Sequence, residues 1–153
     1  MIKILHWKFL MKQLVLFLAL GISLIGNNFL TPIVLSETIK REKKEQLLDS
    51  NEKIIEQLKS KANKLEESGK WSNSTEYRNE ILNLVKQRYG QDHPETASAL
   101  NKLGSSYSYL GQHEKAKILF EKSLEINKKV VGLKHPYTAV VLNNLGWQYK
   151  SLG

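Results

Sequence analysis

The sequence predicts an all-α fold, in which antiparallel helix hairpins stack into an array behind an N-terminal hydrophobic segment. A string of 19 residues occurs twice, at His93–Gly111 and His135–Gly153, and eleven of its positions are identical at an offset of 42 residues. Such a period is typical of stacked repeats, because each unit buries its apolar face against its neighbour. Apolar residues also keep helical spacing through stretches rich in Lys, Glu, Gln and Leu.

Composition narrows the possible functions. The chain of 153 residues has no cysteine, so disulfides, thiol chemistry and thiolate metal sites are excluded. The formal net charge is +8, but three of those charges are lysines in the first twelve residues, and acids are interspersed with bases from Glu37 onwards. A nucleic-acid-binding repeat protein is therefore an alternative that the charge makes possible but does not favour.

The N-terminal segment, residues 1–36, reads as a signal peptide or a membrane anchor. A basic lead precedes the 13-residue apolar run Leu14–Gly26, as in a secretory signal. That run is shorter than a membrane-spanning helix needs, yet no charge occurs between Gln13 and Ser36. Three possibilities stay open: a signal cleaved before Glu37 with export of the remainder, an uncleaved anchor over about residues 13–36, or a buried core helix.

The next stretch predicts one long helix. Residues 37–68 contain neither proline nor glycine, with Ser36 or Thr38 as candidate N-caps and Gly69 as a left-handed C-cap. Residues 37–50 carry almost no apolar stripe, so we expect a charged helical spacer before the repeats.

Three repeat units are expected within residues 51–153. Residues 51–92 form a degenerate unit whose second helix is capped by Ser72 or Asn73 and runs to about Tyr89. Residues 93–134 form a complete hairpin, and residues 135–153 supply a first helix only. Each of the later units opens on His-Pro, where Asp92 or His93, and later His135, is expected to cap the helix and the proline fits its first turn.

These residues resemble the tetratricopeptide repeat. The middle unit has the order of large, small and aromatic residues that is typical of that helix-turn-helix: Leu100, Leu103, Gly104, Tyr107, Ala116, Phe120 and Ser123. The 42-residue period is similar to the longer variety found in kinesin light chains. In the first unit, Ser74 stands at the small-residue position, but Arg78 replaces the large aromatic, for which the neighbouring Tyr77 is a possible partial substitute. We expect Gly104 and Gly146 to mark close helix approaches.

The resemblance implies a concave groove that binds a peptide or a partner helix. Its groove positions fall on Lys59, Asn63, Asn101, Ser105, Asn143 and Trp147. A row of asparagines can pair with peptide backbone through both donor and acceptor atoms, although the same amides could instead bond a neighbouring helix. Lys59 and Asn63 resemble the start of a carboxylate clamp, but the clamp is incomplete.

No catalytic, cofactor or metal site is predicted. His, Asp and Glu lack metal-ligand spacing, and nucleophile and phosphate-loop motifs are absent from the sequence. His113 and Trp71 are expected to pack in the hairpin turns.

The sequence therefore predicts a non-enzymatic protein–protein interaction module, exported or held at a membrane, whose partner is a protein or peptide. Nucleic-acid binding is the alternative from another class, and a truncated fragment without independent function is a third possibility. The apolar residues of the last helix predict self-association through that helix, or a missing neighbour.

Overall fold

The computed structural model describes residues 32–153, and every regular element in that range is an α-helix. The predicted all-α fold is confirmed for this part of the chain. The predicted signal or anchor lies almost entirely outside the described residues. Within residues 32–153, none of the helices combines the length and apolar character that crossing a membrane requires.

The first described helix, α2 (Pro32–Glu67), starts earlier than the sequence predicted. Ser36 and Thr38 therefore lie inside the helix and do not cap it. Pro32 occupies the first turn, where the backbone N–H that proline lacks would have no partner within the helix. Contacts divide the chain into residues 1–40 and residues 41–153. The repeat array belongs to the second of these units.

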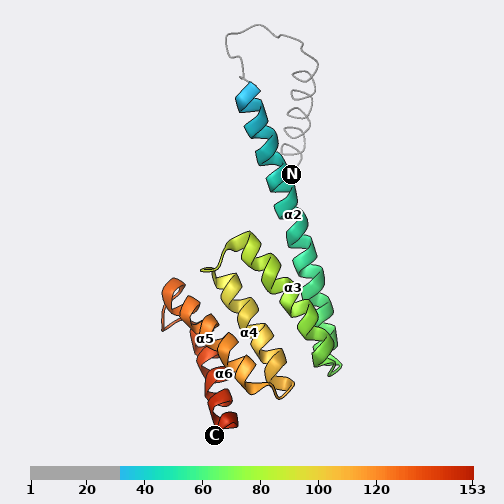
Figure 1. The fold of residues 1–153 in the computed structure, drawn as a ribbon. Helices are drawn as coiled ribbons and strands as arrows, with labels where there is room; N and C mark the ends of the chain where they lie inside the picture. The colour runs from blue at the N-terminus through green and yellow to red at the C-terminus, as the bar shows by residue number, and fades with distance from the viewer. Residues whose placement is uncertain (1–31) are drawn as a thin grey trace. The chain divides into compact units, whose positions relative to one another are not determined.

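Four further helices complete the array: α3 (Trp71–Tyr89), α4 (Pro94–Tyr109), α5 (His113–Val130) and α6 (Pro136–Leu152). Consecutive helices run in opposite directions, and α4 packs against both α3 and α5, while α5 also packs against α6 (Figure 1). The first hairpin is α2 with α3, the second is α4 with α5, and α6 is the first helix of a third.

Every one of these helices ends at a glycine with a positive φ, between 70° and 91°: Gly69, Gly90, Gly111, Gly132 and Gly153. The spacing between successive glycines is 21 residues, which is half of the sequence period. This left-handed conformation suits a residue without Cβ, as was expected for Gly69. The repeat thus determines where each helix ends.

The helix starts follow two different patterns. Nδ1 of His93 accepts a hydrogen bond from the Glu95 N–H at 3.1 Å, and His135 caps α6 in the same way at 3.2 Å. These predicted histidine caps are confirmed, and Asp92 instead pairs with Lys129. The predicted Ser72 or Asn73 cap of α3 is wrong, because the helix begins at Trp71 and its N-cap Lys70 makes no side-chain cap bond.

Two apolar clusters hold the hairpins together. The larger joins α2, α3, α4 and the end of α5, and includes Ile55, Leu58, Ala62, Ile81, Val85, Leu103 and Ile126. The smaller joins α5 and α6 through Ala116, Phe120, Val141 and Leu145. Tyr107 of α4 packs against both clusters, so the core continues from one hairpin to the next.

Candidate functional site

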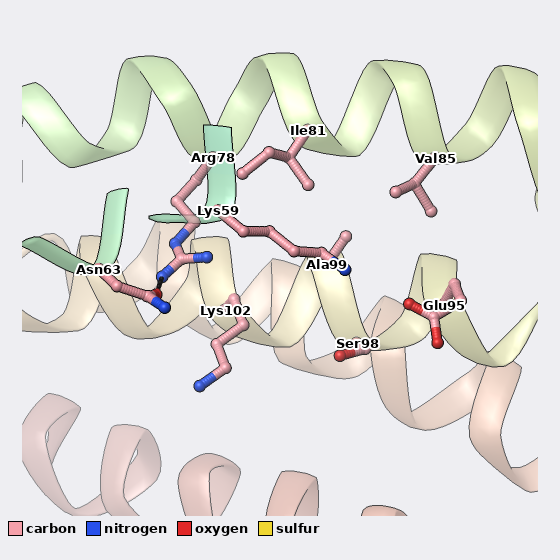
Figure 2. Close-up of a pocket in the computed structure, with 9 residues that line it drawn as sticks. All are labelled: Lys59, Asn63, Arg78, Ile81, Val85, Glu95, Ser98, Ala99 and Lys102. Carbon is pink, nitrogen blue, oxygen red and sulfur yellow. Dashed lines mark hydrogen bonds between the residues drawn. The ribbon is translucent and has the colours of Figure 1, made fainter. Parts of the chain in front are cut away.

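The first candidate region is a hollow of about 240 Å³ on the first hairpin and α4. Two predicted groove residues, Lys59 and Asn63, line it from α2, and Lys102 and Glu95 line it from α4 (Figure 2). The Lys59 ammonium lies 2.8 Å from the exposed carboxylate of Glu56. Among residues 32–153, no carboxylate pairs with Lys102. The hollow therefore carries charges of both signs, and Lys102 is the lysine in its lining that no described carboxylate neutralises.

Asn63 is already occupied by an internal partner. Its Oδ1 accepts a 2.6 Å hydrogen bond from Nη2 of Arg78, the contact drawn as a dashed line in Figure 2. Arg78 also lines the hollow, but only 4% of its surface is exposed. The amide oxygen of Asn63 thus serves the hairpin, and only its remaining groups can serve a ligand.

A partly buried ionic cluster lies behind this hollow. Oε1 of Glu66 accepts hydrogen bonds from Ser74 Oγ (2.6 Å), Arg78 Nε (2.9 Å) and Ser106 Oγ (3.0 Å), and Oε2 accepts from Arg78 Nη2 (2.8 Å). Burial raises the pKa of the Glu66 carboxyl, but the hydrogen bonds from Arg78 and Ser74, with the charge of Arg78, bring the net pKa below its usual value. The cluster ties α2, α3 and α4 together.

The second candidate region is a wider hollow, of about 770 Å³, between the ends of α4 and α6. Three predicted groove residues line it: Ser105, Asn143 and Trp147. The Ser105 hydroxyl donates to the Asn101 carbonyl at 3.0 Å, within its own helix. The indole of Trp147 is 60% exposed, and the Lys150 ammonium lies 5.9 Å from its ring centroid.

Asn101 and Asn143, which the sequence treats as equivalent, have different surroundings. Oδ1 of Asn101 accepts a 2.9 Å hydrogen bond from Nδ2 of Asn144, so this amide joins α4 to α6 beside a small hollow of about 50 Å³. Asn143 is exposed, and its side chain makes no hydrogen bond to any residue within 32–153. Asn101 therefore bonds a neighbouring helix, which was the structural alternative for these asparagines. The amide of Asn143 is still available to bind a peptide.

Family comparison agrees with this hairpin geometry. A model of the tetratricopeptide repeat matches residues 59–129 and again residues 102–153, which together are more than half of the chain. The chain belongs to the tetratricopeptide repeat family. Proteins of this family typically mediate protein–protein interaction and are generally non-catalytic.

Among solved structures, this tetratricopeptide repeat chain is similar to the crystal structure of BtubC (BKLC) from P. vanneervenii. The TM-score is 0.61 at 20% identity, over 78% of this chain and 53% of that one. The chain thus spans about half the length of BtubC, and a likeness at this identity concerns the fold alone. The predicted resemblance to kinesin-light-chain-like repeats is confirmed at that level. No curated protein matches the chain.

Two residues next to the hairpin turns make contacts that were not predicted. Trp71 stacks on Tyr109 of α4, with ring centroids 3.9 Å apart and planes inclined by 9°. His113, expected to be a packing residue, hydrogen-bonds Gln148 Oε1 at 2.9 Å. Both residues connect one hairpin to the next first helix.

Two features were missed by sequence reasoning. The first is the ionic cluster, whose signal was an arginine at the position where the complete repeat has Phe120, with the acidic Glu66 on the preceding helix. The second is the pair of fully buried threonines, Thr96 and Thr138, whose hydroxyls donate to the carbonyls of Gly90 and Gly132 at 2.7 Å. Their recurrence at the repeat period was visible, but it does not say which acceptor they reach.

No metal site is apparent in the described part of the chain, where no three His, Asp or Glu side chains lie close enough to share an ion.

Proposed function

We propose that this protein binds an extended segment of a partner protein in the hollow between α4 and α6, outside the cytoplasm or at a membrane. The observation that carries the proposal is that two neighbouring side chains, Asn143 and Trp147, are accessible to a ligand. They lie four residues apart on one face of α6 and line the same hollow. Because no described residue hydrogen-bonds the Asn143 side chain and the Trp147 indole is 60% exposed, both can contact a ligand without breaking the described fold.

The side chains in this hollow suggest which kind of peptide would bind there. A free amide at Asn143 can donate to and accept from a peptide backbone. The exposed indole of Trp147 offers a large apolar surface of the kind that dominates binding energies at interfaces. Lys150 lies beside that ring and favours an acidic side chain near the apolar one. We therefore expect the bound segment to combine an apolar anchor with a neighbouring Asp or Glu.

The first hollow is the weaker candidate for the same role. Asn63 and Arg78 use their polar atoms within the hairpin, so Lys59 and Lys102 are the main groups left to a ligand. Their charges favour acidic segments generally, without the apolar anchor that Trp147 provides. We expect this hollow to extend the binding surface rather than to define it.

Selection of a displayed peptide library on the full chain tests this proposal. Selected peptides should bind the Trp147→Ala and Asn143→Ala variants at least about tenfold more weakly, as is common when an interface anchor is truncated. Ile118→Ala, which truncates an exposed apolar residue of α5, is the matched control and should leave binding unchanged. Binding that survives both α6 substitutions would place the peptide site elsewhere and refute the proposal.

A further inference from the structure

The turn between α5 and α6 carries an exposed surface that is both basic and apolar. We define the basic corner as Lys128, Val130, Leu133, Lys134 and Tyr137, which lie between the last turn of α5 and the first turn of α6. Its three apolar members are 41%, 63% and 61% exposed, in their order along the chain. Both lysines are exposed as well. Large apolar side chains that gather on a surface commonly mark a contact with a protein or a membrane.

The positive charge of the basic corner is not offset by acidic residues. Asp and Glu are absent from residues 126–153, which contain four lysines. Among residues 32–153, no carboxylate forms an ion pair with Lys128 or Lys134. The neighbouring Lys129 does pair with Asp92, which belongs to the turn between α3 and α4. The two lysines of the corner are therefore available to an anionic partner.

The turn between α3 and α4 shows that this surface chemistry is not a requirement of the repeat. The positions equivalent to Leu133, Lys134 and Tyr137 hold polar or acidic residues there: Gln91, Asp92 and Glu95. All three are exposed, although α5 and α6 follow them in the array. Exposure at these positions thus persists where further helices follow, so it is a property of the turn itself. The two turns differ in what they present to the surroundings.

The basic corner lies at the end of the array through which the N-terminal segment is attached. Consecutive helices are antiparallel, so the end of α3, the end of α5 and the start of α6 lie at one end of the array (Figure 1). Arg88, near the end of α3, donates to the Leu48 carbonyl of α2 at this same end. From Leu48, α2 continues back to residue 41 within the same compact unit. The apolar run of residues 14–26 is therefore connected to the array through the end that carries the basic corner.

We propose that the basic corner binds the surface of an anionic lipid bilayer. Val130 and Leu133 enter the boundary between the headgroups and the acyl chains, where apolar side chains leave water. Lys128 and Lys134 contact the phosphates, since lysine stems can lie along an apolar region while their ammonium groups stay at the charged surface. The ring of Tyr137, apolar with a polar hydroxyl, suits the level of the headgroups.

A bilayer fits the composition of the corner better than other anionic partners do. A nucleic acid also offers phosphates, but it offers no apolar medium for the side chains of Val130 and Leu133. An acidic protein would need an apolar surface shaped to this turn, whereas a bilayer accepts apolar side chains of any shape. The contact goes beyond the peptide binding proposed above, because the basic corner shares no residue with the hollow between α4 and α6.

A fluorescent probe at residue 133 tests this contact in the full chain. The protein has no cysteine, so Leu133→Cys provides a single site for the environment-sensitive fluorophore NBD. The labelled chain is reconstituted into phosphatidylcholine vesicles with or without phosphatidylglycerol, and the N-terminal segment is present in both preparations. NBD emission should rise only with phosphatidylglycerol, and added salt should reverse the rise because it screens the lysines. Gln91→Cys, labelled at the equivalent position, is the matched control and should show no rise.

Substitution of the two lysines is the complementary test. In the chain labelled at residue 133, Lys128→Gln with Lys134→Gln should lower the ratio of bound to unbound corner by about tenfold or more, since each lysine near an anionic surface contributes about fivefold. Both side chains are exposed, so the variant should fold, which circular dichroism checks. Trp147→Ala, which alters the peptide hollow, should leave the lipid response unchanged, so the two proposals can fail separately.

Three results would overturn the lipid contact. The first is emission at residue 133 that does not rise with phosphatidylglycerol, or that rises equally in phosphatidylcholine alone. The second is an equal rise at residue 91, which would show that the response is not specific to the basic corner. The third is an equal rise with soluble polyglutamate in place of vesicles, which would assign the corner to an acidic protein.

Discussion

The first and second hairpins fill the same buried position of the repeat with chemically different side chains. In the second hairpin, the ring of Phe120 lies over Gly104, and the contact is apolar. In the first, the equivalent positions hold Arg78 and Ala62, and the arginine is buried by pairing with Glu66 rather than by stacking. Both residues at this position are almost fully buried, although one is aromatic and the other is charged.

The difference shows which requirements of the repeat are strict. Each hairpin is hydrogen-bonded to the first helix of the following repeat. Ser106 Oγ of α4 donates to Glu66 of α2, and Gln148 Nε2 of α6 donates to Ser108 Oγ of α4 at 2.8 Å. What the two hairpins share is filled volume and satisfied hydrogen bonds; the residue type at the large position is free to change. An ion pair at this position makes the fold sensitive to the loss of one partner, because the remaining charge is then left without a counter-charge.

The largest effect is expected when the ionic cluster loses its acid. Glu66→Gln removes the negative charge and turns an amide N–H₂ or a single carbonyl toward donors from Arg78, Ser74 and Ser106. We expect the free energy of unfolding to fall by about 3 kcal/mol, as when one member of a buried pair is removed. Chemical denaturation measures it, with Glu67→Gln at the exposed neighbouring position as control. Equal stabilities of the two variants would show that the pair contributes nothing to the fold.

A smaller effect distinguishes the two equivalent glycines. Gly104→Ala forces a methyl group against the Phe120 ring and should destabilise the protein by about 1–3 kcal/mol. Gly146→Ala meets open space and should stabilise α6 by up to about 1 kcal/mol through helix propensity. Thermal unfolding of the two variants checks the opposite signs. A loss of stability in Gly146→Ala would mean that the space around Gly146 is filled in solution.

Most of the fold was predictable because the sequence repeats itself. Residues that match at an offset of 42 positions predict how many helices the array has, that neighbouring helices are antiparallel, and near which residues they end. The histidine caps are predicted from the His-Pro pairs at the helix starts. The prediction failed where a residue acts outside the repeat pattern. Lys70 precedes α3 without a capping side chain although Ser72 and Asn73 are better caps, and Trp71 contacts the following helix, which local sequence cannot reveal.

The candidate site was only partly predictable for a related reason. Repeat alignment treats Asn101 and Asn143 as equivalent, but within the described residues only Asn101 is bonded by the helix of another repeat. The amide of Asn101 is used by Asn144, and the amide of Asn143 is free in the described part of the chain. Sequence position therefore predicts which residues are candidates for the groove, whereas the contacts that neighbouring helices make show which of these side chains are still accessible.

The smallest net effect is expected when the chemistry of the second hairpin is transferred to the first. A graft of five substitutions does this at equivalent positions: Ala62→Gly, Glu66→Ser, Ser74→Ala, Arg78→Phe and Ser106→Gln. Replacement of a buried ion pair by well-packed apolar groups is often neutral, so stability should stay within about 1.5 kcal/mol of the wild type. Arg78→Phe alone is the control and should be far less stable, since it leaves Glu66 without its cation and sets the ring against Ala62.

The graft should also change the response to acid. Because the pKa of Glu66 is lowered in the folded protein, its ionised form stabilises the fold at pH values above the ordinary 4.5, and this contribution is lost as the pH falls through the lower folded-state value. The grafted protein has no carboxylate at residue 66, so the difference in unfolding free energy between the two proteins should shift in favour of the graft as the pH drops from 7 toward 3. Denaturation curves at a series of pH values measure that difference. A constant difference across the range would show that Glu66 is not held ionised by Arg78, and that the first hairpin owes its stability to its apolar contacts alone.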